Sequence, residues 1–134
     1  MGHLKEIAVE SGERTELIKL DAQVAKFIAE SGVKDGVCHI FVPHTTAGVI
    51  INEGADPGVA RDFLARLAQL VPHDGHYTHI EDNADSHIKA ALVGSSAMVL
   101  VKGGAPVLGT WQSIFFCEFD GPRRRQVLLR VAEV

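Results

Sequence analysis

Short apolar runs with strand character gather at both ends of the chain, and helical patterns lie mainly between them. Strands are predicted over residues 4–9, 14–20, 36–42, 47–51, 96–102, 105–109, 111–119 and 125–132. Turns at residues 102–104 (Lys-Gly-Gly) and 120–122 (Asp-Gly-Pro) separate closing strands, and tight turns make consecutive strands antiparallel neighbours. The sequence therefore predicts an α+β fold, a mainly antiparallel sheet or sandwich with flanking helices.

Three helices are predicted from their start signals. Asp21 is the expected cap of a helix over residues 22–31. Asp56 and Pro57 combine a capping carboxylate with proline at the first helical position, so a second helix begins there. Asp82 or Asn83 is expected to cap a third helix, over residues 84–93.

Size and charge limit the class of protein. The 134 residues are expected to form a single domain, 1–134. The net charge of -4 argues against nucleic acid or an anionic membrane as a partner. No apolar run approaches the ~20 residues of a membrane span, and no secretory signal is present, so a cytoplasmic protein is expected. Cys38 and Cys117 lie in apolar runs without a CxxC partner and are expected to be buried thiols.

Three of the seven histidines occupy positions that indicate a functional site. His44 follows a buried strand and precedes Thr45 and Thr46; the alternative is a turn histidine satisfied by the backbone. His87 falls on an apolar i, i+3, i+4, i+7 stripe and is expected to face inward. A buried imidazole needs a partner, which is a carbonyl, a carboxylate or a metal. His79 precedes His87 by eight residues, and three histidines leave a fourth metal position open for water or substrate.

The remaining histidines are expected to be bystanders. His39 alternates with Val37 and Phe41 in its strand and is therefore expected to pack in the core.

Several polar residues are candidates for acid/base or anion-binding roles. Glu118 interrupts an apolar strand, so it either points outward or is a buried carboxylate with a partner. Asp85 lies in a first helical turn, where a carboxylate is favourable in any case. Ser95 and its neighbours offer hydroxyl and N–H groups to an anion, and Arg123 offers a bidentate fork for phosphate.

Seven segments, in their order and spacing, resemble the YjbQ-like secondary thiamine-phosphate synthase family. They are FVPHTTA (41–47), INE (51–53), DP (56–57), YTH (77–79), NADSHIKA (83–90), LGTWQ (108–112) and EFDGPR (118–123). The resemblance spans residues ~40–130 of the chain. It implies a β-sandwich-like α+β domain, a homotrimer, and an activity that joins a pyrimidine methyl diphosphate to a thiazole phosphate and releases pyrophosphate.

The resemblance also implies the roles of individual residues. A divalent metal, zinc in the first place, is expected on His44, His79 and His87. Acid/base or supporting roles fall on Asp85, Glu53 and Glu118. The resemblance implies substrate contacts for Trp111, Gln112 and Arg123 and a supporting role for Asn52. Candidates for contact with substrate are also Thr45, Thr46, Asn52 and Ser95.

Three functions follow as hypotheses. The first is a metal-assisted transferase that acts on a phosphorylated small molecule. The second is a metal-dependent hydrolase that uses the same site with water in the open position. The third is a non-catalytic trimer that binds a metal or a small ligand.

Overall fold

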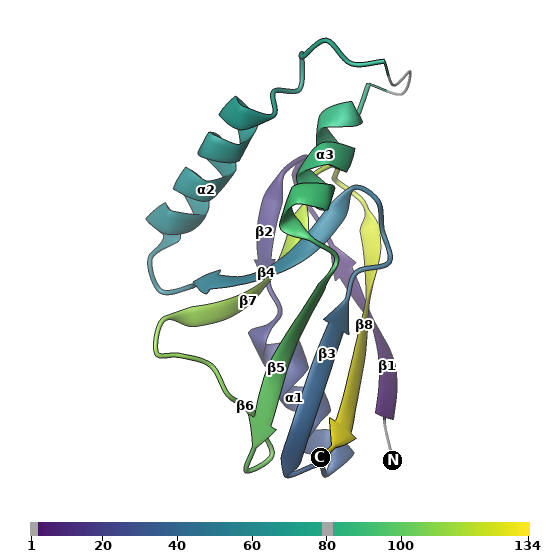
Figure 1. Ribbon diagram of the computed structural model, residues 1–134, viewed down its shortest axis with the longest axis vertical. Helices are drawn as coiled ribbons and strands as arrows, with labels where there is room; N and C mark the ends of the chain where they lie inside the picture. Colours follow the sequence, from purple (N-terminus) through teal and green to yellow (C-terminus); the bar gives the residue numbers. More distant parts are fainter. Residues whose placement is uncertain (1–2, 79–81) are drawn as a thin grey trace.

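The computed structural model describes residues 3–78 and 82–134, which form two antiparallel sheets and three helices (Figure 1). The strands are β1 (His3–Glu10), β2 (Glu16–Lys19), β3 (Asp35–Phe41), β4 (Ala47–Glu53), β5 (Ser96–Lys102), β6 (Ala105–Pro106), β7 (Gln112–Glu118) and β8 (Arg124–Glu133). The helices are α1 (Asp21–Ser31), α2 (Pro57–Leu70) and α3 (Ala84–Val93). The predicted fold class is confirmed. None of these helices combines the length and hydropathy that a membrane crossing requires.

The strands are divided between a larger and a smaller sheet. The larger sheet has the order β1-β8-β3-β5-β6, and the smaller has the order β2-β7-β4. The predicted turn at residues 102–104 is confirmed, since it joins β5 to β6 with Gly103 and Gly104 at φ 62° and 77°. The prediction that residues 120–122 join antiparallel neighbours is wrong, because β7 and β8 belong to different sheets. Residues 119–123 carry the chain from one sheet to the other, and the Gly121 N–H bonds to Arg14 O at 3.0 Å.

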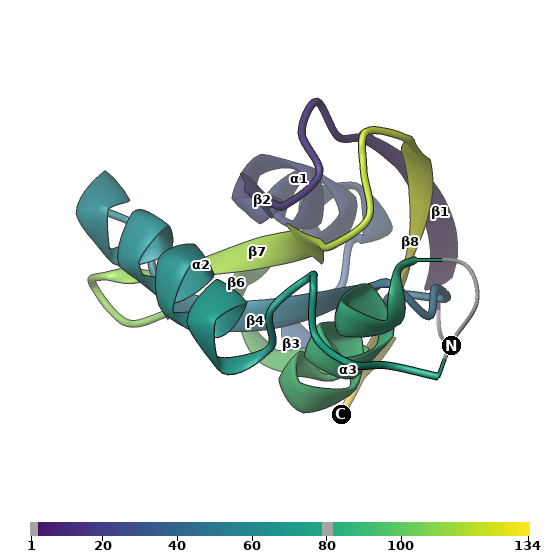
Figure 2. The ribbon, with the colours of Figure 1, turned by 90° about the horizontal axis from the view of Figure 1, so that it is seen from above.

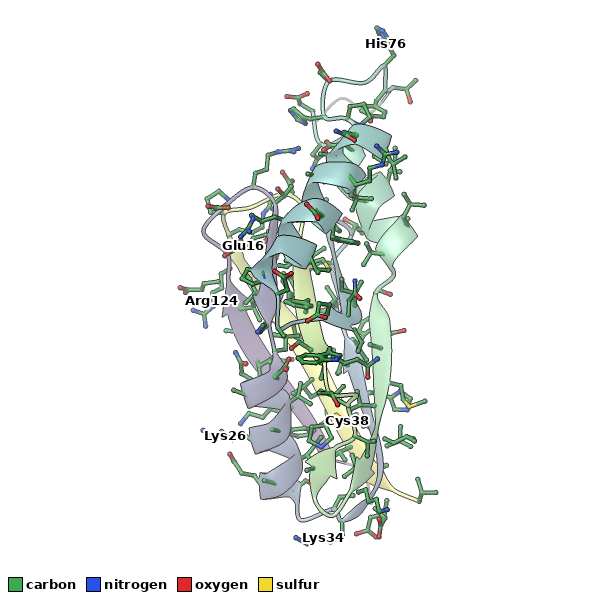
Figure 3. The ribbon with its side chains drawn as sticks, turned by 90° about the vertical axis from the view of Figure 1, so that its left-hand side faces the viewer. Glu16, Lys26, Lys34, Cys38, His76 and Arg124 are labelled. Carbon is green, nitrogen blue, oxygen red and sulfur yellow. The ribbon has the colours of Figure 1, made fainter. Side chains whose placement is uncertain are left out.

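The main core lies between the two sheets and α1. Ile28 of α1, Ile40 of β3 and Phe116 of β7 are all fully buried there. Cys38 is also buried in the interior (Figure 3), as predicted, and burial raises the pKa of its thiol to about 11. His39 was predicted to pack, and this is wrong. Gly36, Cys38 and Ile40 occupy the core face of β3, so the alternate residue His39 is exposed.

A second apolar cluster covers the other face of the smaller sheet. Cys117 and Phe119 pack there with Ala90 of α3 and Leu67 of α2. Figure 2 shows α1 on one side of β7 and β4, with α3 on the other. The small sheet is therefore covered on both faces. Ala47, Val49 and Ile51 contribute to the main core, and Ile50 contributes to the second cluster.

Helix α3 is rotated relative to the predicted stripe. Its buried residues are Asp85, Ser86, Lys89 and Ala90, whereas Ile88 and Leu92 are exposed. The prediction that the stripe of Ala84, His87, Ile88 and Ala91 faces inward is therefore wrong. A charged pair can take the buried face because Asp85 and Lys89 neutralise each other there.

The helix starts follow the predictions in part. Asp56 caps α2 as predicted, since its Oδ1 accepts the Gly58 N–H at 2.8 Å. Asp21 is not a cap but the first residue of α1, and its Oδ1 accepts the Ile114 N–H of β7 at 2.8 Å. Asn83 occupies the N-cap position of α3, but its side chain makes no capping bond.

Candidate functional site

His44 and His87 line the same two cavities, although they are far apart in the sequence. His44 lies just after β3, and His87 lies on the second turn of α3. Each cavity has a volume of about 360 Å³, and Thr45 also belongs to both walls. Because the two cavities share three lining residues, they lie next to each other, and we consider them together as one candidate site.

The two cavities differ in chemistry. The first, which we call the arginine cavity, is lined by Pro43, His44, Thr45, Thr46, Asn83, His87, Asp120, Arg123 and Arg125. The second, the serine cavity, is lined by His44, Thr45, Ala47, His87, Ala90, Ala91, Gly94 and Ser95. Four of the residues predicted to contact substrate, Thr45, Thr46, Ser95 and Arg123, therefore lie in the walls of these cavities.

Glu118 is a fully buried carboxylate that holds Arg125 in the wall of the arginine cavity. The Arg125 Nε donates to Glu118 Oε1 at 2.8 Å, and Nη2 donates to Oε2. The Ser11 hydroxyl and the Asp120 N–H donate to the same carboxylate at 2.7 and 3.0 Å. Burial alone raises the pKa of Glu118, but these donors outweigh burial and lower it. Of the two predicted alternatives, the structure has the buried carboxylate, which is ionised and fully engaged.

His44 is held as a neutral ring. The Gln126 backbone N–H donates to its Nε2 at 2.9 Å. Burial, together with the positive charge of Arg125, lowers the pKa of His44. An imidazole that accepts on Nε2 carries its proton on Nδ1, so the ring presents a single N–H donor.

The residues described do not form a metal site in this arrangement. No group of three His, Cys, Asp or Glu side chains within them is placed to hold an ion. A metal on Nε2 of His44 would also displace the Gln126 N–H. The third predicted ligand, His79, lies outside the described residues. The site on His44, His79 and His87 therefore stays a prediction.

The hydrogen-bond partners of Asp85 direct its carboxylate away from the predicted acid/base role. Its carboxylate is fully buried and accepts from Arg14 at 3.1 and 3.2 Å, from Lys89 at 3.3 Å and from the His73 ring at 3.1 Å. Burial acts to raise the pKa of Asp85, but the three donors lower it well below its usual range. The carboxylate anchors α3 to the loop between β1 and β2.

The other predicted residues lie at the opposite end of the smaller sheet. Ala47 pairs with Glu118 in the β4–β7 ladder, whereas Glu53 pairs with Gln112. The six-residue separation along β4 corresponds to about 20 Å. Asn52 pairs with Ser113, and Trp111 accepts the Gly54 N–H. Within one chain, Asn52, Glu53, Trp111 and Gln112 are therefore not brought to the histidines.

Glu53 has a local structural role at that end. Its carboxylate accepts the N–H groups of Ala55 and Asp56 at 2.7 and 3.2 Å. Glu53 thereby organises the turn that leads into α2.

Sequence reasoning missed Arg125 and selected Arg123 in its place. The signal was present in the alternation of β8, since Arg125, Val127, Leu129 and Val131 share one face and all are buried. Asn83 and Asp120 were also missed as a pair. Asn83 Nδ2 donates to Asp120 Oδ2 at 2.9 Å across 37 residues of sequence, which no local pattern indicates.

The fold and the cavities define a small α+β protein with a polar site where the two sheets meet α3. A model of the UPF0047 protein YjbQ-like family matches residues 5–134. The chain belongs to this family.

Relatives and solved structures of this family are similar to the chain over nearly its whole length. The UPF0047 protein MJ1081 of Methanocaldococcus jannaschii is 49% identical, over 92% of this chain and 89% of that one. The UPF0047 protein YugU of Bacillus subtilis is 42% identical, over 96% and 98%. A crystal structure of an uncharacterized member from Clostridium acetobutylicum has a TM-score of 0.94 at 45% identity, covering 96% and 99%. A protein of unknown function from Sulfolobus solfataricus has a TM-score of 0.96 at 33% identity, covering 100% and 99%.

Proposed function

We propose that the protein is a small-molecule transferase that binds a phosphorylated substrate in the joined cavities and has secondary thiamine-phosphate synthase activity. The observation that carries the proposal is that His44 and His87 line both cavities, with Arg123 and Arg125 in the wall of the arginine cavity and Ser95 in the wall of the serine cavity. Arginine and hydroxyl donors suit phosphate oxygens. Two adjoining cavities suit two substrates that must meet.

The reaction has simple requirements. The ring nitrogen of the thiazole phosphate attacks the methylene carbon of the pyrimidine methyl diphosphate and forms a C–N bond. The C–O bond to the diphosphate breaks, and its electron pair leaves with pyrophosphate. No acid/base residue is required for these two bond changes, which fits an arrangement in which the buried carboxylate behind Arg125, that of Glu118, is already occupied by four donors. Stabilisation of the leaving diphosphate by fixed donors is the main contribution of the protein.

A zinc ion on His44, His79 and His87 is a separate part of the proposal and rests on the resemblance alone. When bound, such an ion would supply positive charge to the leaving diphosphate. The chain's own part in this is to present His87 from α3 and to release His44 from the Gln126 N–H.

The activity is tested with purified protein and both thiamine precursors. We expect thiamine phosphate and pyrophosphate to form, and we expect His87→Ala to lower the rate by about 100-fold, as is typical when one fixed group that stabilises the developing charge is removed. His76→Ala is the matched control, because His76 is exposed, lines neither cavity and should leave the rate unchanged. Metal analysis of the same preparations, made without chelator, checks for zinc that His87→Ala loses.

The results separate the alternatives. No thiamine phosphate in vitro, and no rescue of cells that lack their thiamine-phosphate synthase, would remove the synthase activity. Turnover of phosphate esters that stops on chelation would instead indicate a hydrolase. Product formation by zinc-free protein would rule out the metal as part of the proposal but would leave the transferase activity in place.

We propose that the protein is a homotrimer in which copies meet through the outer face of the larger sheet. Phe41, Met98 and Leu100 project from that face, and Met98 and Leu100 are 51% and 56% exposed. Exposed apolar patches of this kind mark interaction surfaces.

Light scattering is expected to give a mass of three chains. Met98→Lys combined with Leu100→Lys should reduce it, because two cations on this face cannot be buried unpaired. Lys26→Ala on α1 is the control, since Lys26 is exposed and its ion pair with Glu30 lies within the helix. A single-chain mass for the unaltered protein refutes the assembly.

A further inference from the structure

We propose that Arg125 binds the phosphoryl oxygens of the substrate through its Nη1, and that Glu118 is the positioning residue that aims it. This inference deepens the proposed function and rests on it for the identity of the substrate. It assigns the role to Arg125 in place of Arg123, the arginine that the sequence suggested.

The bonds of Arg125 leave one nitrogen available. Nε and Nη2 donate to Glu118, and Nη2 also donates to Thr46 Oγ1 at 2.8 Å. Within residues 3–78 and 82–134, Nη1 has no hydrogen-bond partner, yet it is not among the buried atoms that lack one. Arg125 is only 3% exposed and lines the arginine cavity. What remains accessible of this side chain is therefore the donor that faces the cavity.

The surroundings fix the guanidinium before any ligand arrives. Glu118 holds one edge, Thr46 holds Nη2, and the Ser11 hydroxyl and the Asp120 N–H hold Glu118 in turn. A donor that is already ordered loses little conformational entropy on binding, which favours affinity. The planar fork retains two N–H groups on Nη1 for phosphate oxygens.

Arg123 is in a different state. Its side chain is about half exposed, Nε donates to the Asp120 carbonyl at 2.9 Å, and Nη2 donates to Asp120 Oδ2 at 3.0 Å. The same Oδ2 accepts from Asn83. Arg123 therefore offsets Asp120, which is the one carboxylate that residues 3–78 and 82–134 contribute to the cavity wall. It lowers the repulsion that Asp120 would exert on an anion, and it is not the fixed donor.

The test is calorimetric titration of the full chain with pyrophosphate, the product that leaves. Arg125→Lys should weaken binding by about tenfold or more, because lysine keeps the charge for Glu118 but lacks the second edge of the fork. Arg124→Lys is the matched control and should bind as the unaltered protein does. Arg124 is next in sequence but points outward (Figure 3), where it pairs with Glu10 at 3.3 Å.

A double-variant cycle tests the positioning role of Glu118. Glu118→Gln should weaken pyrophosphate binding by a factor close to that of Arg125→Lys. The double variant should show little further loss, because both changes remove the same aimed donor. A purely structural role for Glu118 would give losses that multiply. Melting temperatures of all variants show which of them are folded.

The outcomes distinguish this inference from the proposed function. If pyrophosphate binding depends on Arg125 but no thiamine phosphate forms, the anion site stands and the synthase activity does not. If thiamine phosphate forms and Arg125→Lys leaves pyrophosphate affinity and the KM for the pyrimidine diphosphate unchanged, the inference is overturned alone. Absence of pyrophosphate binding by the unaltered protein, or its loss in Arg123→Ala but not in Arg125→Lys, also overturns it.

Discussion

Glu118→Gln is expected to lower the free energy of unfolding by about 3–5 kcal/mol, the usual cost of breaking a buried ion pair from one side. The amide keeps the shape of the carboxylate, but it leaves the charge of Arg125 buried without a counterion. Denaturant unfolding monitored by circular dichroism measures the change.

The control for this prediction is an ion pair at the surface. Glu10→Gln removes the partner of Arg124, and both side chains of that pair are more than 70% exposed. Surface pairs contribute about 0–1 kcal/mol, so this variant should unfold almost as the unaltered protein does. Equal losses of unfolding free energy in the two variants would contradict the prediction, because the buried pair would then contribute no more than the surface pair.

Asp85→Asn is expected to destabilise the protein by about 3 kcal/mol for a related reason. It removes the counterion of Lys89, which is buried on α3, and it weakens the attachment of Arg14 to that helix. Asp82→Asn is the control, because Asp82 is exposed and lies 3.6 Å from the His73 ring. A stability of Asp85→Asn within 1 kcal/mol of the unaltered protein would contradict the prediction.

The contribution of the Asp85 carboxylate to the free energy of unfolding should also depend on pH in the acid range. The pKa of Asp85 is lower in the folded protein than in the unfolded chain, so its contribution is present above the unfolded value near 3.8 and is lost as the pH falls through the folded value. Asp85→Asn should therefore lose less stability than the unaltered protein when the pH falls from about 5 to about 2. Unfolding curves at several pH values give this comparison.

The fold was accessible from the sequence because its signals are local. Alternation of apolar residues, the Asp56 cap and the glycines at 103 and 104 each act over a few residues, and the structure has the corresponding strands, helix start and turn. The change of sheet after β7 was not accessible. The Asp-Gly-Pro segment at 120–122 has the composition of a hairpin turn, and only the packing of distant strands decides otherwise.

The site was predictable in part for the same reason. His44 and His87 were selected by position, and the structure brings them into the same cavities. The rotation of α3 was missed because hydrophobic periodicity assumes an apolar buried face. Here the buried face is charged, and its main partner, Arg14, is 71 residues away.

The ion pair of Glu118 and Arg125 has a mechanical consequence. Glu118 is the last residue of β7 in one sheet, and Arg125 is near the start of β8 in the other, so the pair fastens the two sheets together at their joint. A ligand held by that arginine adds a tie at the same joint. Ligand binding in the cavity and the relative alignment of the two sheets are therefore coupled. A bound ligand should raise the melting temperature of the protein as a whole.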